Sequence, residues 1–387
     1  MRRRVLWLVK GLGRGGAERL LTLMAPKISA SGFDLDVAYL LPGEDAFFTD
    51  LQQAGISTIC LDARRTIDLR WVSNLRRLLR TTAYDLVHTH SPVPAVAARL
   101  LCRTGVPIVH TEHNLWERYH RLTFAANAAT YHRNALALAV SDGVAASIRP
   151  PRWARSRLYP PVRTLLHGVN PEDSRVGPDA RREARERLGL HPSVPVIGNV
   201  ANLTPKKDHA GLLDAIDRLR RRFPDVIALV VGTGPLEQEL RADAARRGLD
   251  RNVLFLGMRD DVLEILPALD VFVLSSRFEG LPISMLEAMV SEIACVVTSV
   301  GGIPEALQDG EEGVLVPPGD PEALAHALER VLADPDQRHE MGLAAGRRVR
   351  ADFSIDRAVR SHIELYEALT SAGEPQPGRS KHGDPDP

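Results

Sequence analysis

Short apolar runs alternate along the chain with longer segments whose apolar residues recur at helical spacing. The runs are rich in Val, Ile and Leu, and those in the first half predict strands near 5–10, 34–41, 57–61, 85–90, 107–112 and 136–141. The segments between and after them predict helices near 16–30, 45–54, 68–81, 93–103, 118–134 and 142–148. Continuous apolar strands that alternate with helices are typical of a parallel sheet covered on both faces. The pattern therefore predicts an α/β fold.

Two proline pairs, Pro150-Pro151 and Pro160-Pro161, interrupt the pattern. Proline fixes φ and lacks the backbone N–H that helices and sheets use, so the segment between the pairs is predicted to be a loop. Beyond it the alternation resumes and predicts strands near 194–200, 226–231, 252–256, 270–275, 294–299 and 313–317, with helices between them.

The chain is too long for one hydrophobic core, since 387 residues exceed the usual size of a single domain. We predict two Rossmann-like domains, at residues 1–167 and 168–354, whose parallel sheets face each other across a cleft. A further helix at 355–370 has no strand to pair with. Residues 371–387 are polar and rich in Pro and Gly, which predicts a disordered tail.

Charge and cysteine content exclude several classes of protein. Lys and Arg number 49, as do Asp and Glu, and a net charge of zero does not fit a polycation that acts on nucleic acid. Three widely spaced cysteines without a C-x-x-C pair favour a reducing cytoplasm over a zinc or redox site. The apolar stretch from Val5 to Val9 ends at Lys10, and no later run is long enough to cross a membrane. We therefore expect a cytoplasmic protein without a nucleic-acid partner.

Ligands of open α/β sheets gather where strands end, so the loops after strands hold the candidate chemistry. The loop after the first strand has the spacing G-x-G-x-x-G at Gly11, Gly13 and Gly16 and leads into a helix. Glycine backbone beside a helix N-terminus can bind phosphate, but a tight turn without a ligand gives the same pattern. The second strand ends at 40–43 without the acidic residue of a dinucleotide-binding fold, which disfavours an NAD-dependent oxidoreductase.

Adjacent lysines are conspicuous in this chain, because only five of its 49 cationic residues are lysines. Lys206 and Lys207 follow the first strand of the second half, in the loop equivalent to the glycine loop. Two ammonium groups opposite a glycine loop suit a diphosphate in the cleft, since lysine offers a compact charge at close range. The alternative is a solvated loop without a ligand.

Two glutamates, Glu279 and Glu287, follow the strand at 270–275 with seven residues between them. The first lies in the loop and the second about one turn into the next helix, so both can point into the cleft. The Gly-Leu-Pro-Ile sequence at 280–283 brings the amides of a helix start within reach of a phosphate. For an isolated pair of carboxylates, a capping or surface role is the alternative.

Histidines cluster at the ends of two strands of the first half, in His88-Thr89-His90 and His110-Thr111-Glu112-His113-Asn114. The spacing of His88 and His90 puts both on one face of a strand, which would suit half of a metal site. No carboxylate or thiolate stands at a convincing spacing to complete that site. Contact with a substrate is therefore the favoured interpretation, and His113 is the best placed for it.

Together these residues resemble the retaining glycosyltransferases of family 4 (glycosyl transferases group 1), which transfer sugar from a nucleotide sugar and have the two-domain GT-B fold. The resemblance covers the chain up to about residue 370. Its motifs are Gly-Gly-Ala-Glu at 15–18, Asp85-Leu-Val-His-Thr-His90, His110-Thr-Glu-His-Asn114, Val140-Ser-Asp-Gly, His167-Gly-Val-Asn170, Asn202-Leu-Thr-Pro-Lys-Lys-Asp-His209, Gly232-Thr-Gly-Pro235, the two glutamates, Gly301-Gly-Ile-Pro-Glu305 and Gly313-Val-Leu-Val-Pro317. The family's final helix crosses back onto the first domain, which would explain the helix at 355–370.

The resemblance implies a role for each candidate residue. Glu287 would bind the ribose hydroxyls of the nucleotide, whereas Glu279 and His113 would contact the transferred sugar. Lys207 would hold the diphosphate. The implied catalytic residues are His113 and Glu279, and the implied donor-binding residues are Gly15, Gly16, Asn202, Lys206, Lys207, Gly280, Leu281, Pro282, Ile283 and Glu287. The family often has an arginine where this chain has Asn202, so the phosphate charge would rest more on Lys207, with help from Lys206 or Arg14.

The expected function is transfer of a sugar from a nucleotide-diphosphate sugar to a saccharide or lipid-linked acceptor, in the synthesis of cell-surface polysaccharide or glycoconjugate. The resemblance implies a retaining hexosyltransferase. We expect no metal or other cofactor, since fixed cations and helix N-termini can stabilise the departing diphosphate. Asp260-Asp261 lacks the D-x-D spacing of a metal seat and looks like a helix start. The alternatives are a nucleotide-sugar epimerase or phosphorylase of the same fold, and an inactive sugar-nucleotide-binding subunit.

An arginine-rich segment at 149–163 is the candidate for a membrane contact. It contains five arginines and no acidic residue, interleaved with Trp153 and Tyr159. Such a segment could meet an anionic membrane surface or a lipid-pyrophosphate acceptor, which would place the protein peripherally on the inner face of the plasma membrane. An arginine-rich loop between domains is the alternative.

Overall fold

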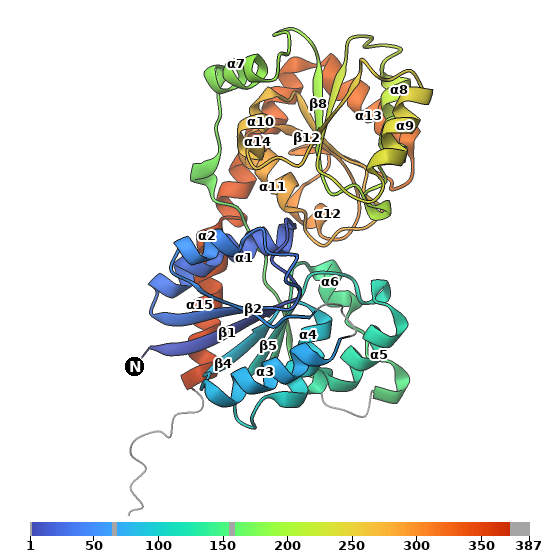
Figure 1. Ribbon diagram of the computed structural model, residues 1–387. Coiled ribbons are helices and arrows are strands. Elements are labelled where there is room, and N and C mark those ends of the chain that lie inside the picture. Colours follow the sequence, from blue (N-terminus) through green and yellow to red (C-terminus); the bar gives the residue numbers. More distant parts are fainter. Residues whose placement is uncertain (1, 64–67, 155–158, 372–387) are drawn as a thin grey trace, which may run out of the picture.

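Two parallel sheets form the framework of the protein (Figure 1). The computed structural model describes residues 2–63, 68–154 and 159–371. The first sheet contains, in spatial order, β3 (Ser57–Cys60), β2 (Phe33–Tyr39), β1 (Arg3–Val9), β4 (Leu86–Thr89), β5 (Ile108–Glu112), β6 (Leu136–Ala139) and β7 (Val162–Thr164). The second contains β10 (Val253–Gly257), β9 (Ile227–Val231), β8 (Val196–Val200), β11 (Val271–Leu274), β12 (Ala294–Thr298) and β13 (Gly313–Val316). All neighbouring strands are parallel, which confirms the predicted α/β fold with two Rossmann-like halves.

Helices cover both faces of each sheet. The first half contains α1 (Gly16–Ala30), α2 (Phe48–Gln53), α3 (Arg70–Thr81), α4 (Pro92–Leu101), α5 (Arg121–Thr130) and α6 (Asp142–Ser147). The second half continues with α7 (Pro178–Arg187), α8 (His209–Leu219), α9 (Glu237–Arg246), α10 (Val262–Ile265), α11 (Ile283–Val290), α12 (Ile303–Ala306), α13 (Pro321–Ala333), α14 (Pro335–Asp352) and α15 (Ile355–Ser371). None of the described helices is long and apolar enough to span a membrane.

Strand β1 shows why the apolar runs are continuous. Val5 and Trp7 belong to one hydrophobic cluster, whereas Leu6 belongs to the cluster on the other face of the sheet, and all three are fully buried. Because successive side chains of a strand point to opposite faces, a sheet buried on both faces needs apolar residues at every position. The twelve predicted strands begin and end within two residues of the observed ones for the same reason.

Two local predictions in the first half are wrong. Strand β7 was not predicted, because its residues, Val162–Thr164, are all exposed and form no apolar run, although they pair in parallel with β6. The helix predicted at 118–134 is divided into the 3₁₀ turn η1 (Trp116–Arg118), α5 and the 3₁₀ turn η2 (Tyr131–Arg133). The chain is extended at Tyr119 and His120, between η1 and α5. Trp116 and Tyr119, on either side of η1's end, both donate hydrogen bonds to Glu112 at the end of β5, which accounts for this break.

Two segments that run between the halves lie side by side. The N–H of Val169 donates to the carbonyl of Phe353 at 2.9 Å, and the N–H of Ile355 donates to the carbonyl of Val169 at 2.8 Å. Gly168 allows this approach, because a Cβ there would lie 2.0 Å from the carbonyl oxygen of Phe353. The segment that leads to α7 is thus tied to the joint between α14 and α15. The domain boundaries at 167 and 354 stay a prediction.

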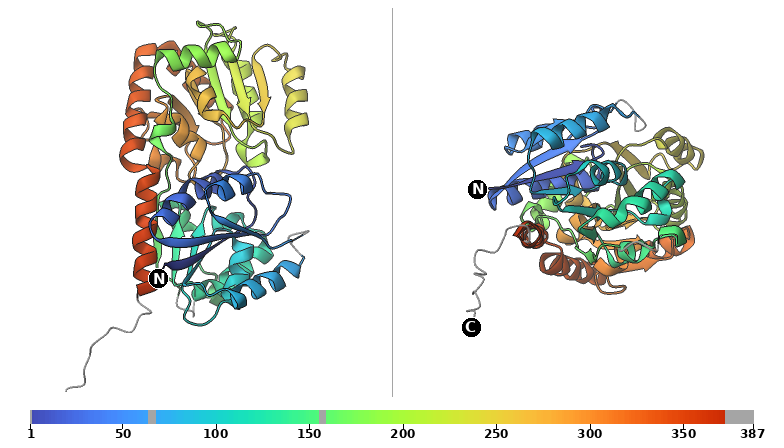
Figure 2. Two further views of the ribbon diagram at one scale, coloured as in Figure 1. Left: turned by 60° about the vertical axis from the view of Figure 1, so that its left-hand side comes forward. Right: turned by 90° about the horizontal axis from the view of Figure 1, so that it is seen from below.

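The last helix, α15, packs against the first half of the chain. Helix α14 packs against α11 of the second half, whereas α15 packs against α1 of the first. Figure 2 shows the two helices as one column that runs alongside both halves. Trp7 Nε1 donates to the Tyr366 hydroxyl at 2.9 Å inside the core, and Lys27 Nζ donates to Asp356 at 2.8 Å on the surface. The predicted tail, apart from Ser371 at the end of α15, lies outside the described residues.

Candidate active site

A cleft of about 770 Å³ lies between the two halves, at the carboxyl ends of the strands. All of the predicted site residues line it, namely Gly15, Gly16, His113, Asn202, Lys206, Lys207, Glu279, Gly280, Leu281, Pro282, Ile283 and Glu287. Residues far apart in the sequence therefore meet in one place. The structure fixes their positions, whereas their roles stay predictions.

Two helix N-termini face each other across this cleft. Helix α1 begins at Gly16 and α11 begins at Ile283, and a Cβ placed on Gly16 would lie 3.4 Å from the Ile283 side chain. The first amides of a helix have no partner within it, and together with the helix dipole they favour an anion. The cleft therefore has an anion seat, defined as the space between the N-termini of α1 and α11 beside Lys206 and Lys207.

The loop that carries the two lysines is held in place by the loop that carries Glu279. The Ser275 hydroxyl donates to the carbonyl of Lys207 at 2.9 Å, and the N–H of Arg277 donates to the carbonyl of Lys206 at 2.8 Å. Asp208, the next residue, adopts the left-handed conformation with φ of 50°, which few residues other than glycine accept without strain. The lysine positions are thus fixed by backbone contacts and by one strained residue.

Lys207 and Glu279 form an ion pair inside the cleft. Lys207 Nζ lies 2.5 Å from Glu279 Oε1, which also accepts a hydrogen bond from the Ser276 hydroxyl at 2.7 Å. Both side chains are largely buried, with 13% and 7% of their surface exposed. Burial, together with Lys207, lowers the pKa of the adjacent Lys206. Two cationic side chains therefore stand beside the anion seat, and one of them already contacts the residue predicted to meet the sugar.

Glu287 lies one turn into α11 and pairs across the cleft with Arg19 of α1. Arg19 Nε donates to Glu287 Oε1 at 2.8 Å, and the glutamate side chain is 8% exposed. Burial raises the pKa of Glu287, whereas the guanidinium of Arg19 counteracts that rise. The carboxylate predicted to bind ribose is thus engaged by a cation of the opposite half.

His113 follows β5 and forms the wall of the cleft opposite Gly280. A Cβ at Gly280 would lie 2.5 Å from the carbonyl oxygen of His113, so only glycine lets the two loops approach this closely. His113 Nε2 lies 3.4 Å from Nδ1 of the buried His90. Burial and the nearby His167 and His110 lower the pKa of His113 to about 3. At neutral pH its imidazole is uncharged, and it can donate or accept a hydrogen bond but offers no positive charge.

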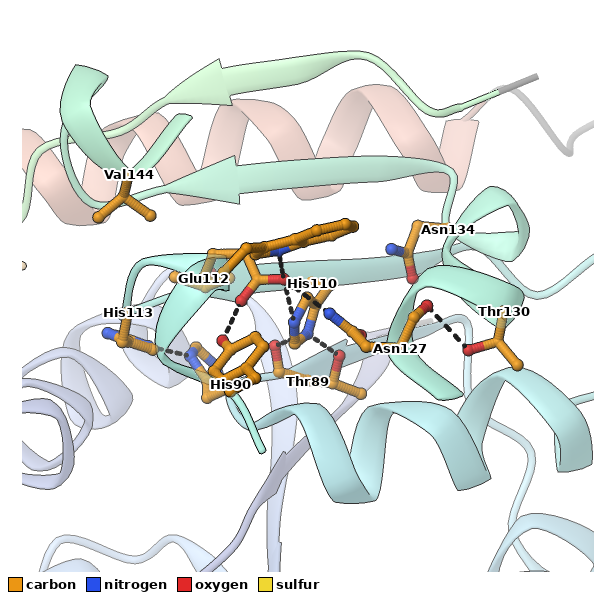
Figure 3. A network of polar contacts seen from close by, with 12 residues as sticks. Thr89, His90, His110, Glu112, His113, Asn127, Thr130, Asn134 and Val144 are labelled. Carbon is orange, nitrogen blue, oxygen red and sulfur yellow. Dashed lines mark hydrogen bonds and ion pairs between the residues drawn. The ribbon is translucent and has the colours of Figure 1, made fainter. Parts of the chain in front are cut away.

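A buried polar network stands behind His113 (Figure 3). Glu112 is fully buried, and it accepts hydrogen bonds from Trp116 Nε1 at 2.7 Å, from Asn127 Nδ2 at 3.2 Å and from the Tyr119 hydroxyl. Asn127 in turn accepts a hydrogen bond at 2.7 Å from Arg99, whose guanidinium is buried as well. The network thus compensates a buried carboxylate with a buried cation and fixes the end of β5 directly before His113.

His88, which was considered for half of a metal site together with His90, is engaged by other side chains of the core. Both ring nitrogens of His88 lie within hydrogen-bond distance of other side chains, Nδ1 at 2.5 Å from the Tyr366 hydroxyl and Nε2 at 2.7 Å from Thr111. The rings of His88 and His90 lie 4.1 Å apart, centre to centre. Among the described residues, no three His, Cys, Asp or Glu side chains are grouped so that they could hold a metal ion. His88 is therefore a core residue that joins β4 to α15.

Motifs of the two halves meet at the rim of the cleft. The Glu305 carboxylate accepts hydrogen bonds from the N–H groups of Asp142 and Gly143 at 2.8 and 2.9 Å, at the start of α6. His167 Nε2 lies 3.0 Å from the carbonyl oxygen of Leu281, and Arg14 pairs with Asp260 at 2.6 Å. Side chains of each half thus contact the other half at several points around the cleft.

The sequence did not identify Arg19, which lines the cleft, nor Ser276 and Glu305, which contact Glu279 and the start of α6. Arg19 comes directly after the Gly-Gly-Ala-Glu motif, and its spacing of three from Gly16 places it one turn into α1 on the cleft side. That spacing was available as a signal, but nothing in the sequence showed that α1 faces α11. Glu305 ends a recognised motif, and its partner in the other half could not be read from the sequence.

Two family models match consecutive parts of the chain. "Glycosyltransferase Family 4" matches residues 14–173, and "Glycosyl transferases group 1" matches residues 180–348. The chain is a family 4 glycosyltransferase. The motifs from which the resemblance was inferred lie within these two ranges, and the predicted family is confirmed. Nothing in the comparisons favours an epimerase, a phosphorylase or an inactive subunit.

Relatives of this glycosyltransferase include enzymes with named substrates. It is 27% identical over 299 residues to the UDP-Gal:alpha-D-GlcNAc-diphosphoundecaprenol alpha-1,3-galactosyltransferase of Escherichia coli, over 72% of this chain and 74% of that protein. It is 36% identical over 210 residues to the GDP-mannose-dependent alpha-(1-6)-phosphatidylinositol monomannoside mannosyltransferase of Mycolicibacterium smegmatis, over 50% of this chain and 54% of that one.

A solved structure shares the whole fold. The Anabaena protein Alr3699/HepE, in complex with UDP and glucose, superposes with a TM-score of 0.82 at 22% identity, over 95% of this chain and all of that one. The GT-B arrangement of two Rossmann-like halves around a cleft is therefore confirmed for this glycosyltransferase.

Proposed function

We propose that this glycosyltransferase moves a hexosyl group from a nucleotide-diphosphate sugar to a saccharide or lipid-linked acceptor, in the synthesis of cell-surface polysaccharide or glycoconjugate. The observation that carries the proposal is the anion seat, where the N-termini of α1 and α11 and two lysines surround a space suited to a diphosphate. The relatives, which include a UDP-galactose-dependent enzyme with a diphosphoundecaprenol acceptor, support this choice of substrates.

In the proposed reaction, the bond between the anomeric carbon and the diphosphate oxygen breaks, and negative charge builds on the departing diphosphate. Lys207 and the amides at the start of α11 stabilise that charge, which lowers the barrier because they are already in place. The acceptor hydroxyl bonds to the anomeric carbon from the face that the diphosphate leaves, and its proton passes to the diphosphate. The product keeps the anomeric configuration. His113 and Glu279 hold the sugar, and the fixed cations supply the charge, so we propose that no metal or other cofactor is needed.

Binding of nucleotide sugars tests the proposal directly. We expect one of the UDP-, GDP- or ADP-sugars to raise the melting temperature of the protein, because a ligand at about 100 times its Kd stabilises the folded state by about 2.7 kcal/mol. A thermal-shift screen measures this, followed by assay of sugar release or transfer with the donor that binds. The same screen on a Glu287→Ala variant is the control, since the shift should shrink there. Absence of a shift with every nucleotide sugar would contradict the proposal.

We further propose that the protein acts in the cytoplasm and meets the membrane peripherally through 149–163. Trp153 is 56% exposed, Val162 is 38% exposed, and the neighbouring Arg152 and Arg163 are exposed as well, which supports an amphipathic contact. Residues 155–158 of this segment lie outside the described residues.

Vesicle binding tests the membrane contact. We expect co-sedimentation with vesicles to rise with their content of anionic lipid and to fall in the variant Arg152→Glu/Trp153→Ser, since each cation near an anionic surface contributes about 1 kcal/mol. The matched control is Arg246→Glu, a reversal of charge on the exposed face of α9 far from this segment. Binding that does not depend on anionic lipid, or that the double variant leaves unchanged, would refute the contact.

A further inference from the structure

An arginine from the first half pairs with Glu287, the carboxylate to which the family resemblance assigns the donor's ribose. Arg19 Nε donates to Glu287 Oε1 at 2.8 Å, and the glutamate is almost completely buried. The arginine side chain, in contrast, is 35% exposed and lines the cleft. A buried carboxylate needs a partner, and here the partner comes from the opposite side of the binding site.

The geometry places the guanidinium of Arg19 beside the anion seat. Arg19 lies three positions after Gly16, where α1 begins, and Glu287 lies four positions after Ile283, where α11 begins. The ion pair therefore stands about one helical turn, about 5.4 Å, behind the two N-termini that form the seat. A ligand with a diphosphate at the seat and a ribose at Glu287 would therefore have to lie close to Arg19, which lines the same cleft.

Most of the other cations of the cleft are already paired with carboxylates. Lys207 pairs with Glu279, Arg14 with Asp260 and Arg259 with Asp261, whereas Lys206 also stands beside the seat and burial lowers its pKa. Asn202, which lines the same cleft, is uncharged. A diphosphate brings more than one negative charge, and an arginine fork can bind phosphate oxygens in a bidentate manner.

We propose that Arg19 is a diphosphate-binding residue, and that donor binding changes its partner from Glu287 to the diphosphate while the ribose hydroxyls take its place at Glu287. The inference rests on the proposed function and goes beyond it, because it assigns to α1 a charged side chain that changes its partner when the donor binds. The exchange leaves the guanidinium paired with an anion and the carboxylate hydrogen-bonded in each state. Bound donor would then be held between α1 and α11 by contacts to both halves.

If this exchange occurs, removal of the charge of Arg19 should affect the binding of a nucleoside and of a nucleoside diphosphate differently. A nucleoside must displace Arg19 from Glu287 and offers it no phosphate in return, so removal of the arginine's charge should leave nucleoside binding unchanged or improve it. A nucleoside diphosphate gains the arginine as a ligand, so the same change should weaken its binding. A residue that only stabilises the empty cleft would alter both affinities alike.

Titrations of matched ligand pairs test the inference. The pairs are UDP with uridine, GDP with guanosine and ADP with adenosine, each titrated by calorimetry into the full-length protein. We expect the ratio of the nucleoside Kd to the nucleoside diphosphate Kd to fall about tenfold to hundredfold in Arg19→Gln, the usual effect of losing a charged hydrogen bond. Arg19→Lys keeps a charge and should lose less. Arg246→Gln, which removes an exposed arginine of α9, should leave the ratio unchanged.

A second variant, Glu287→Gln, tests the inference independently in case Arg19→Gln does not fold. Glu287→Gln removes the negative charge but keeps an amide of similar shape, and it frees Arg19 for the phosphates. We expect it to weaken nucleoside binding while the ratio stays the same or rises. An unchanged ratio in Arg19→Gln overturns the inference but leaves the proposed function intact. If the wild-type protein binds none of the three diphosphates, both the inference and the proposed function fail.

Discussion

Replacement of Lys207 by alanine is expected to lower kcat/KM for sugar transfer about a hundredfold to a thousandfold, the usual cost of losing one preorganised group that stabilises developing charge. Lys207 is held by Ser275 through its backbone and by Glu279 through its side chain, so its ammonium is already positioned in the cleft before the donor binds. Transfer from the donor that the thermal-shift screen identifies measures the effect. The loss should appear largely in kcat, because the diphosphate carries more negative charge in the transition state than in the bound donor.

Controls separate this catalytic effect from a loss of folding. Within the part of the chain that the structure describes, removal of Lys207 leaves Glu279 with the Ser276 hydroxyl as its remaining hydrogen-bond partner, and this loss alone can destabilise the protein. The variant Lys207→Met/Glu279→Gln removes both charges, so it should restore the melting temperature without restoring activity. Lys27→Ala, which removes an exposed lysine of α1 that pairs with Asp356, should transfer sugar at the wild-type rate. A wild-type kcat/KM in Lys207→Ala would remove the lysine from the proposed mechanism.

The strands could be predicted because burial leaves a strong signal in a parallel sheet. Strand β1 is apolar on both faces, and a short continuous apolar run of that kind is typical of a strand buried between two layers of helices. Strand β7 has no such signal, since its three residues are exposed. Its pairing with β6 depends on the path that the chain takes between α6 and β7. The predicted helix at 118–134 failed for a related reason. Its residues have helical spacing, but Tyr119 near its predicted start, and Trp116 just before it, donate hydrogen bonds to the buried Glu112, which a continuous helix does not take into account.

The positions of the site residues were predictable to the extent that they follow strands. His113, Lys207 and Glu279 each come after a strand, and parallel strands end at the same edge of a sheet. The pairing of Arg19 with Glu287 depends instead on how two halves of the chain face each other, across 268 positions of sequence. The periodicity of either helix alone contains no information about that arrangement.

Glu112 is a second case, in the core, of contacts that local sequence patterns do not predict. In the sequence it is one polar residue among several at the end of a strand, and only His113 beside it was singled out. In the fold it is fully buried and compensated by donors from three segments of the first half. Its partners Trp116, Tyr119 and Asn127 lie four, seven and fifteen positions further along the chain, in η1, after it and in α5. The network therefore becomes visible only when the path between β5 and β6 is known.

We therefore expect Glu112→Ala to lower the free energy of unfolding by about 3–5 kcal/mol, the usual cost of breaking a buried charged network by removing one partner. Three donors, on Trp116, Tyr119 and Asn127, would lose their acceptor, and the buried Arg99 would lose the carboxylate that balances its charge. Denaturant unfolding measures the change. Glu117→Ala, which removes an exposed carboxylate five positions away, should cost less than about 0.5 kcal/mol.

The pH dependence of the difference in unfolding free energy between the wild type and Glu112→Ala shows whether the charge of the carboxylate causes that difference. Burial alone would raise the pKa of Glu112, but contacts with His110, Tyr119 and Trp116 hold it at about 2, below the ordinary value of 4.5. A carboxylate whose pKa is lower in the folded state stabilises the protein fully above its unfolded pKa and loses that contribution as the pH falls toward the folded value. The difference between the wild type and Glu112→Ala should therefore shrink between about pH 5 and pH 3. If it stays constant over that range, the effect of the substitution is one of packing, and the buried charge does not hold the end of β5 beside His113.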